Sequence, residues 1–117
     1  MRYALLIYGN TEALGSITDD DRRRMNAGFA AVVARPNVTG YLRLQNVELA
    51  TTVRDEQGKT LLTDGPFVDS KDFLGGFIFV EADDLDGALA VASELQELGL
   101  ARAVEVRPVN EEELVRA

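Results

Sequence analysis

Two segments of the chain are apolar at odd and even positions alike. They are residues 2–8, with the sequence RYALLIY, and residues 74–82, with the sequence LGGFIFVEA. A strand with one face in water alternates apolar and polar residues, whereas a strand covered on both faces does not. The pattern therefore predicts two strands that are covered on both sides.

A period of 3.6 residues predicts a first helix from Thr18 to the residues before Pro36. The Thr18 hydroxyl can cap the helix, and Asp21 follows three residues later as in a capping box. Proline excludes the helical conformation from the residue that precedes it, so the helix stops there. Residues 22–24, three consecutive arginines, are interpreted as a solvated face with aspartates beside it. The apolar stripe consists of Met25, Phe29, Val32 and Val33.

A second helix is expected after Asp83 and Asp84, either of which can cap it, and Gly99 ends it. Its apolar stripe consists of Leu85, Ala88, Leu89, Ala92 and Leu95. Between the two helices, residues 41–45 read as a strand. Residues 51–54 and 60–63 flank a polar loop and read as a β-hairpin.

A last strand covers residues 102–109, and Pro108 indicates a sheet edge or a strand end. The whole order predicts one α+β domain over residues 1–117, a ferredoxin-like split βαβ sheet with an extra hairpin. Both helices would pack on one face and leave an apolar face bare, which does not stay in water. We therefore expect a homodimer with the two sheets facing each other about a two-fold axis. The alternative is a monomer whose hairpin folds over the open face.

Composition narrows the chemistry. The chain has no cysteine and no histidine, which excludes thiol chemistry and the commonest general base at neutral pH. Twenty acidic residues against twelve basic ones, a net charge of −8, argue against a nucleic-acid partner. No apolar run approaches the roughly 20 residues of a membrane span. The apolar core of the first ten residues, about six residues, is shorter than the roughly 7–15 residues of a secretory signal. We expect a cytoplasmic protein without a membrane partner, and no cofactor-binding motif is present.

The segment from Asp64 to Asp72 concentrates candidate chemistry. Asp64, Gly65 and Pro66 predict a sharp, rigid turn, which either aims a carboxylate at a ligand or merely reverses the chain. Asp69 and Lys71 lie two residues apart, close enough to pair or to flank one ligand.

Two further pairs admit both a structural and a functional interpretation. Gly75 and Gly76, inside a strand, mark a bulge or a place where a ligand or another backbone approaches closely. Glu105 and Arg107 share one face of the last strand, as a surface ion pair or as the polar wall of a cleft. Asp64, Asp69 and Glu105 match no metal-loop spacing, and cations lie among them, so no metal site is expected.

The stretch TLLTDGPFVDSKDFLGGFIFVEADDLDGALAVA, followed by VEVRPV, resembles the DGPF group of the YCII-related proteins. That group has the approximate pattern T-D-G-P-F-x-E-[ST]-K-E-x-L-G-G-[FY], then a helix with an acidic cap, then V-E-V-R-P. The segments MRYALLIYGN and ATTVR fit as well, so the resemblance covers essentially the whole chain. The matching motif residues are Asp64, Gly65, Pro66, Phe67, Asp69, Ser70, Lys71, Gly75, Gly76, Glu105, Arg107 and Pro108.

The resemblance implies a ferredoxin-like fold that dimerises into an α/β barrel, with a small-molecule or active site in a cleft near the dimer interface. Asp69 replaces the family's usual glutamate and has a shorter reach. Some YCII-like members, including a dehydrochlorinase of aromatic degradation, carry a His–Asp pair proposed as catalytic. This chain has no histidine, so that mechanism does not transfer.

Two functions follow as hypotheses from these residues. If the protein is an enzyme, Asp64 or Asp69 is the expected general base, and Lys71 and Arg107, with Glu105 beside them, bind an anionic or carbonyl substrate. The alternative is a non-catalytic regulatory or interaction module, because proteins of the DGPF group often accompany extracytoplasmic-function sigma factors.

Overall fold

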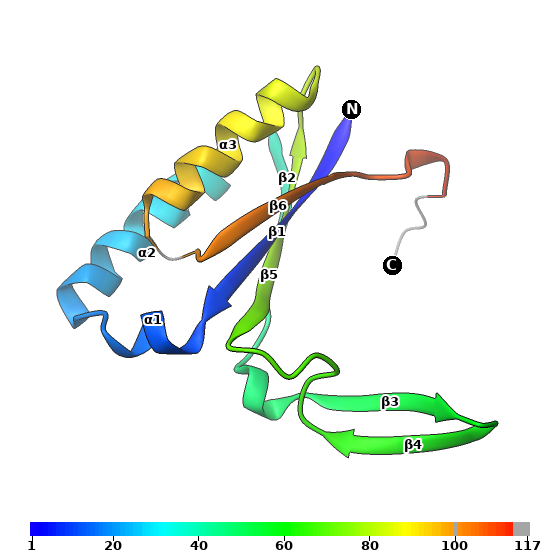
Figure 1. Cartoon of the computed structure of the whole chain (residues 1–117). Coiled ribbons are helices and arrows are strands. Elements are labelled where there is room, and N and C mark those ends of the chain that lie inside the picture. The colour runs from blue at the N-terminus through cyan, green and yellow to red at the C-terminus, as the bar shows by residue number, and fades with distance from the viewer. Residues whose placement is uncertain (100, 114–117) are drawn as a thin grey trace.

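A four-stranded sheet with helices on one face forms the body of the molecule, and a separate hairpin projects from it (Figure 1). The structure is a computed structural model that describes residues 1–99 and 101–113. In chain order its helices and strands are β1 (Arg2–Asn10), α1 (Thr11–Gly15), α2 (Asp19–Val33), β2 (Val38–Arg43), β3 (Thr51–Glu56), β4 (Lys59–Asp64), β5 (Asp72–Glu81), α3 (Leu85–Glu97) and β6 (Ala103–Pro108). Short 3-10 turns cover Val47–Leu49 and Glu111–Glu113.

The strand order is β2-β5-β1-β6, and every neighbouring pair is antiparallel. This is the arrangement expected for the ferredoxin-like split βαβ fold. The two strands whose odd and even positions are both apolar, β1 and β5, lie at the centre of the sheet. The strand that carries Pro108 is an edge strand, where a missing backbone donor costs nothing.

The core lies between the sheet and the helices α2 and α3. Tyr3, Leu5, Ile78 and Val80 are buried on the helix-facing side of the two central strands. The side chains that cover them from the helices are Phe29, Val32, Ala88, Val91, Ala92 and Leu95. Within the described residues no helix is long and apolar enough to cross a membrane.

The buried stripe of α3 differs from the predicted one. Leu85 and Leu89 remain 48% and 42% exposed, and Val91 is buried instead. Apolar residues cover more than half of the circumference of this helix, so periodicity alone allows two neighbouring stripes. The sheet selects the stripe built on Ala88 and Ala92, because small side chains let the helix axis approach the strands.

The predicted helix caps are present. The Thr18 hydroxyl accepts a hydrogen bond from the Asp21 amide at 3.1 Å, and the Asp84 carboxylate accepts one from the Gly87 amide at 3.0 Å. Gly99 has a φ of +85°, the left-handed conformation that ends many helices. The helix α1 was not expected from the sequence, although Asn10 caps it by accepting the amides of Glu12 and Ala13.

The glycine pair in β5 forms a bulge and a close backbone contact. Ile7 pairs with Gly76 and Tyr8 pairs with Leu74, so Gly75 is an extra residue in the ladder. A Cβ on Gly76 would lie 2.6 Å from the carbonyl oxygen of Leu42 in β2. The close neighbour of Gly76 is therefore a partner strand, one of the two possibilities that the sequence left open.

No helix of the described residues covers the second face of the sheet. This face presents the half-buried side chains of Leu6, Tyr8, Phe77 and Phe79, and Glu105 and Arg107 lie on the same face beside them. The hairpin β3–β4 forms its own two-stranded sheet and extends away from this face (Figure 1). The alternative in which the hairpin covers the open face of its own chain is therefore wrong. The radius of gyration, 16.1 Å, exceeds the about 13 Å expected for a compact domain of this length.

Candidate functional site

The Asp64-Gly65-Pro66 turn is held rigidly at the base of the hairpin. Gly65 has a φ of +104°, which favours glycine, and its amide donates to the carbonyl of Ala50 at 2.7 Å. The Thr52 hydroxyl donates to the Gly65 carbonyl, also at 2.7 Å. These bonds connect the end of β4 to the start of β3, so the chain after Pro66 leaves the hairpin in a fixed direction.

The segment that follows this turn walls an open cleft of about 740 Å³, within the size range of small-molecule sites. Pro66, Phe67 and Val68 line it from the loop, and residues 44–47, 49 and 50 line much of the rest. Tyr8 and Leu74 contribute from the open face of the sheet. Phe67 is 74% exposed, so an aromatic ring stands at the cleft unburied by its own chain. We call this space the DGPF cleft.

Three polar groups of the DGPF cleft, those of Asn46, Ser70 and Asp72, take part in local hydrogen bonds. Asp72 accepts from the Asn10 side-chain amide at 2.9 Å, and the Ser70 hydroxyl accepts from the Asp72 amide at 3.1 Å. Asn46 caps the 3-10 turn by accepting the Glu48 amide at 3.3 Å. The lining is otherwise mostly apolar, which suits an organic molecule with a few polar substituents.

The residues predicted to carry chemistry separate into two groups. Asp64 and Asp69 are exposed and lie on either side of the lining segment from Pro66 to Val68. Lys71 follows closely and forms an ion pair with Glu12 at 2.5 Å. Within residues 1–99 and 101–113, no three carboxylates gather as a metal-ion ligand set would.

Glu105 and Arg107 form the second group. They pair with each other at 3.8 Å on the open face of β6, opposite Leu6 and Ala4 of β1. The Lys71 carbonyl accepts from Thr11, just past the other end of β1, roughly 20 Å away at about 3.3 Å per residue. A single chain therefore does not bring Lys71 and Arg107 to one ligand.

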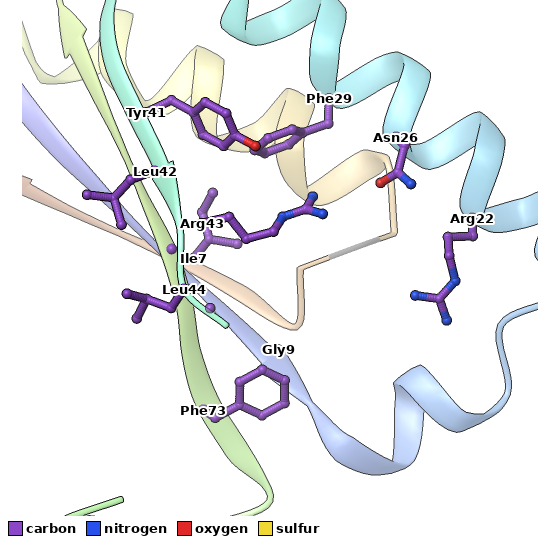
Figure 2. Close-up of a pocket in the computed structure, with 12 residues that line it drawn as sticks. Ile7, Gly9, Arg22, Asn26, Phe29, Tyr41, Leu42, Arg43, Leu44 and Phe73 are labelled. Atoms are coloured by element: carbon purple, nitrogen blue, oxygen red, sulfur yellow. The ribbon is translucent and has the colours of Figure 1, made fainter. Parts of the chain in front are cut away.

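A second cleft, of about 270 Å³, lies on the helix-facing side of the same sheet region (Figure 2). Arg22, Asn26 and Phe29 line it from α2, and Tyr41 and Arg43 line it from β2. The expected solvated face for residues 22–24 holds for Arg23 and Arg24, which pair with Asp20 and Asp21. Arg22 is exposed as well, but it also lines this cleft, since residues 22, 26 and 29 share one helix face. We call this space the arginine cleft.

Two titratable groups outside the clefts have shifted pKa values. The pKa of Asp21 lies below its usual value, first because of the hydrogen bond with the Thr18 side chain and then because of the Arg24 guanidinium. The pKa of Arg35 is raised, chiefly by its hydrogen bond with Glu94. Both shifts belong to helix surfaces and describe structural ion pairs.

The fold and the clefts define a class of protein: a ferredoxin-like α+β domain with ligand-sized clefts on both faces of one sheet end. The chain belongs to the YCII-related family, because the sequence model of the YCII-related domain matches residues 1–112. An uncharacterised protein of Rhizobium meliloti (strain 1021) is 31% identical over 114 residues, which cover 93% of this chain and 92% of that protein.

Solved structures support the fold. One similar structure is 5-chloro-2-hydroxyhydroquinone dehydrochlorinase from Burkholderia phenoliruptrix AC1100, in complex with 2,5-dihydroxybenzoquinone. Its TM-score is 0.51 at 17% sequence identity, and the match covers 94% of each chain. At this identity the likeness establishes a shared fold, as the strand order already indicates.

Proposed function

We propose that this chain is a homodimeric small-molecule-binding protein of the DGPF group, with its ligand in the DGPF cleft near the dimer interface. One relationship carries the proposal: Tyr8 and Leu74 belong both to the uncovered sheet face and to the lining of the cleft. Whatever covers the open face therefore also closes one side of the cleft.

A second copy of the chain is the proposed cover. The open face has apolar rows across β1 and β5, flanked by the Glu105–Arg107 pair at one edge and Leu42 at the other. A sheet face of this kind is self-complementary about a two-fold axis, and stacked sheets bury their apolar side chains at about 10 Å separation. Two facing sheets of this kind would form the dimeric α/β barrel.

The projecting hairpin supports the same assembly. Val53 and Leu62 are cross-strand partners, and they remain 66% and 70% exposed. An isolated two-stranded hairpin is only marginally stable in water, so a contact with a second subunit would stabilise it. In the proposed dimer the hairpin lies against the second subunit and encloses the DGPF cleft.

The ligand proposed for the DGPF cleft is a small planar organic molecule with carbonyl or hydroxyl substituents. Tyr8, Phe67 and Phe73 offer aromatic surfaces for its ring. The dehydrochlorinase that shares the fold was solved with a compound of that kind, 2,5-dihydroxybenzoquinone. If a reaction occurs, Asp64 or Asp69 acts as the base, because the two residues flank the lining segment from Pro66 to Val68 in the sequence. Arg107 enters through the interface, and Lys71 reaches the substrate after leaving Glu12.

Two measurements test this proposal. The first is the solution mass of the wild type and of L42K by multi-angle light scattering, with L89K as the matched control. Leu42 and Leu89 are 44% and 42% exposed, but only Leu42 lies on the open face. We expect a dimer for the wild type and L89K and a shift to monomer for L42K. A monomeric wild type at micromolar concentration would reject the homodimer.

The second measurement is a thermal-shift screen of hydroxylated quinones and aromatic carbonyl compounds against the wild type, D64N and D69N. Binding that the variants retain, without turnover, assigns the cleft to a binding protein. If the wild type converts a compound and either D64N or D69N does not, the substituted residue is the base. A screen in which no compound raises the melting temperature would favour the regulatory interaction module, for which the exposed Val53–Leu62 pair is the available contact surface.

A further inference from the structure

We propose that the arginine cleft is a second binding site, specific for a small aromatic carboxylate that Arg22 and Arg43 hold together. This site does not require the proposed dimer, and it lies next to the DGPF cleft, with which it shares Leu44 and Phe73. It lies on the helix-facing side of the sheet, where Ile7, Phe73 and Gly76 meet the first turns of α2.

The side chains converge from two elements (Figure 2). Tyr41 and Arg43 pair with Ile78 and Gly76 of β5, which places both on the helix-facing side of the sheet. Figure 2 shows the Arg43 side chain extending from β2 toward α2 and the Arg22 side chain extending from α2 into the same space. Asn26 lies one turn after Arg22 on α2, and its side-chain amide adds a donor and an acceptor to the cleft.

The charge of the cleft is one-sided. The described residues of its lining include two guanidinium groups and no carboxylate. Among the described residues, neither Arg22 nor Arg43 takes part in an ion pair, whereas Arg23, Arg24 and Arg35 each have a carboxylate partner. Two cations without carboxylate partners in one concavity of a chain with net charge −8 favour an anionic ligand.

Arg43 is oriented before any ligand arrives. Its guanidinium carbon lies 5.5 Å from the centroid of the Phe29 ring, a cation–π arrangement. Phe29 is in turn fixed by an edge-on contact with Tyr41, with 5.2 Å between the ring centroids. A planar guanidinium stacked in this way presents its N–H edge to a carboxylate and loses less side-chain entropy on binding.

The apolar side of the cleft selects an aromatic body for the anion. The ring of Phe73 lies over Gly9, and both line the cleft together with Ile7 and Tyr41. A volume of about 270 Å³ lies just below the usual range for ligand pockets, so a compound with one ring fits and a nucleotide does not. A carboxylate on a single ring matches both the cations and the aromatic surface, whereas free phosphate would use only the cations.

The test is a titration of the full-length chain with benzoate. Calorimetry measures the affinity, and amide chemical shifts in ¹H–¹⁵N spectra locate the site. Benzamide is the neutral probe of the same shape, and inorganic phosphate is the anion without a ring. We expect saturable benzoate binding, with shifts confined to residues 22–29, 41–44 and 73–76. We expect benzamide and phosphate to bind at least roughly tenfold more weakly, as the loss of a charge-assisted hydrogen bond or of the ring contact implies.

Variants locate the effect. R22Q and R43Q should each weaken benzoate binding by roughly tenfold or more, whereas R23Q should bind as the wild type. Arg23 is the matched control, because it is adjacent to Arg22 but pairs with Asp20 outside the cleft. R43Q can unfold, because Arg43 packs on the Phe29 ring. In that case benzoate binding by R22Q decides the question, because Arg22 is exposed.

Three results obtained with benzoate alone would overturn the proposal. They are the absence of saturable benzoate binding, equal binding of benzoate by the wild type and R22Q, and shifts confined to residues 44–50 and 66–70. The last result would place benzoate in the DGPF cleft and would support the proposed function instead. Phosphate binding as strong as benzoate binding would also reject an aromatic carboxylate as the ligand.

Discussion

The ring of Phe73 lies directly on the backbone of Gly9 in the neighbouring strand. A Cβ added to Gly9 would be 2.8 Å from the Cζ atom of Phe73, closer than side chains approach one another. Phe73 lines both the DGPF cleft and the arginine cleft. The absence of a side chain at Gly9 therefore determines the position of the Phe73 ring in both clefts.

We expect G9A to move the Phe73 ring and to destabilise the fold by about 1–3 kcal/mol, the usual cost of an overpacked contact. Urea unfolding of the wild type and G9A measures the loss. The double variant G9A/F73L should recover most of it, because a smaller side chain removes the clash. A double variant as unstable as G9A would show that the contact with Phe73 is not the cause.

G76A should be more damaging than substitution at an open position. The carbonyl oxygen of Leu42 lies 2.6 Å from the added Cβ, and backbone cannot rotate away as a side chain can. We expect a loss of about 2 kcal/mol or more in the free energy of unfolding. The control is G15A, where nothing lies within 4 Å of the added Cβ. Similar losses in the two variants would contradict the assigned role of the Leu42 carbonyl.

The stability of α2 should depend on pH through Asp21. Its pKa is lowered in the folded state, chiefly by the Thr18 side chain, so the unfolded chain binds more protons as the pH falls. The stabilisation is fully present above the ordinary aspartate pKa of about 3.9 and is lost as the pH falls through the lower folded pKa.

Urea unfolding of the wild type and D21N between pH 7 and pH 2 measures this contribution. The two stabilities should differ at pH 7 and converge at the acid end of the range. T18V removes the largest cause of the shift, so it should reduce the difference that D21N produces. A difference between the wild type and D21N that stays constant over the whole range would rule out the assigned coupling.

Amide hydrogen exchange should reveal whether the hairpin β3–β4 has a partner. In a dimer, the amides of residues 51–64 should be protected at high protein concentration and exchange faster on dilution or in L42K. The variant V53S/L62S should lose the same protection while the amides of β1 and β5 stay protected. Protection that is independent of concentration would show that the hairpin is stable by itself.

Local patterns in the sequence predict most of the helices and strands. The caps at Thr18 and Asp84 and the stop at Gly99 each depend on one residue and its immediate neighbours, and each was predictable. The short helix α1 was missed although Asn10 caps it, because the Gly9-Asn10 pair also reads as a turn. The buried stripe of α3 was predicted on a neighbouring face of the helix. Only packing against the sheet shows that Val91 is buried and Leu89 is exposed.

The candidate sites were less predictable than the fold. The rigid turn at Gly65 follows from local chemistry, and the DGPF pattern drew attention to the loop that walls a cleft. The arginine cleft was not predicted, because Arg22 and Arg43 lie on different elements and meet only when β2 packs beside α2. Lys71 and Arg107 show the converse, since a shared motif does not place them together in one chain.

The position of β1 has a consequence for how the chain folds as it is synthesised. Leu5 pairs with Ile78 on one side and with Val106 on the other, so both neighbours of the first strand are made much later. The hairpin β3–β4 pairs residues that are close in sequence and can form as soon as it leaves the ribosome. Until β5 and β6 have emerged, both edges of β1 lack a partner strand and its apolar side chains stay exposed. The sheet therefore cannot be complete until β6, its last strand, has been made, and this interval is when the nascent chain most needs protection from aggregation.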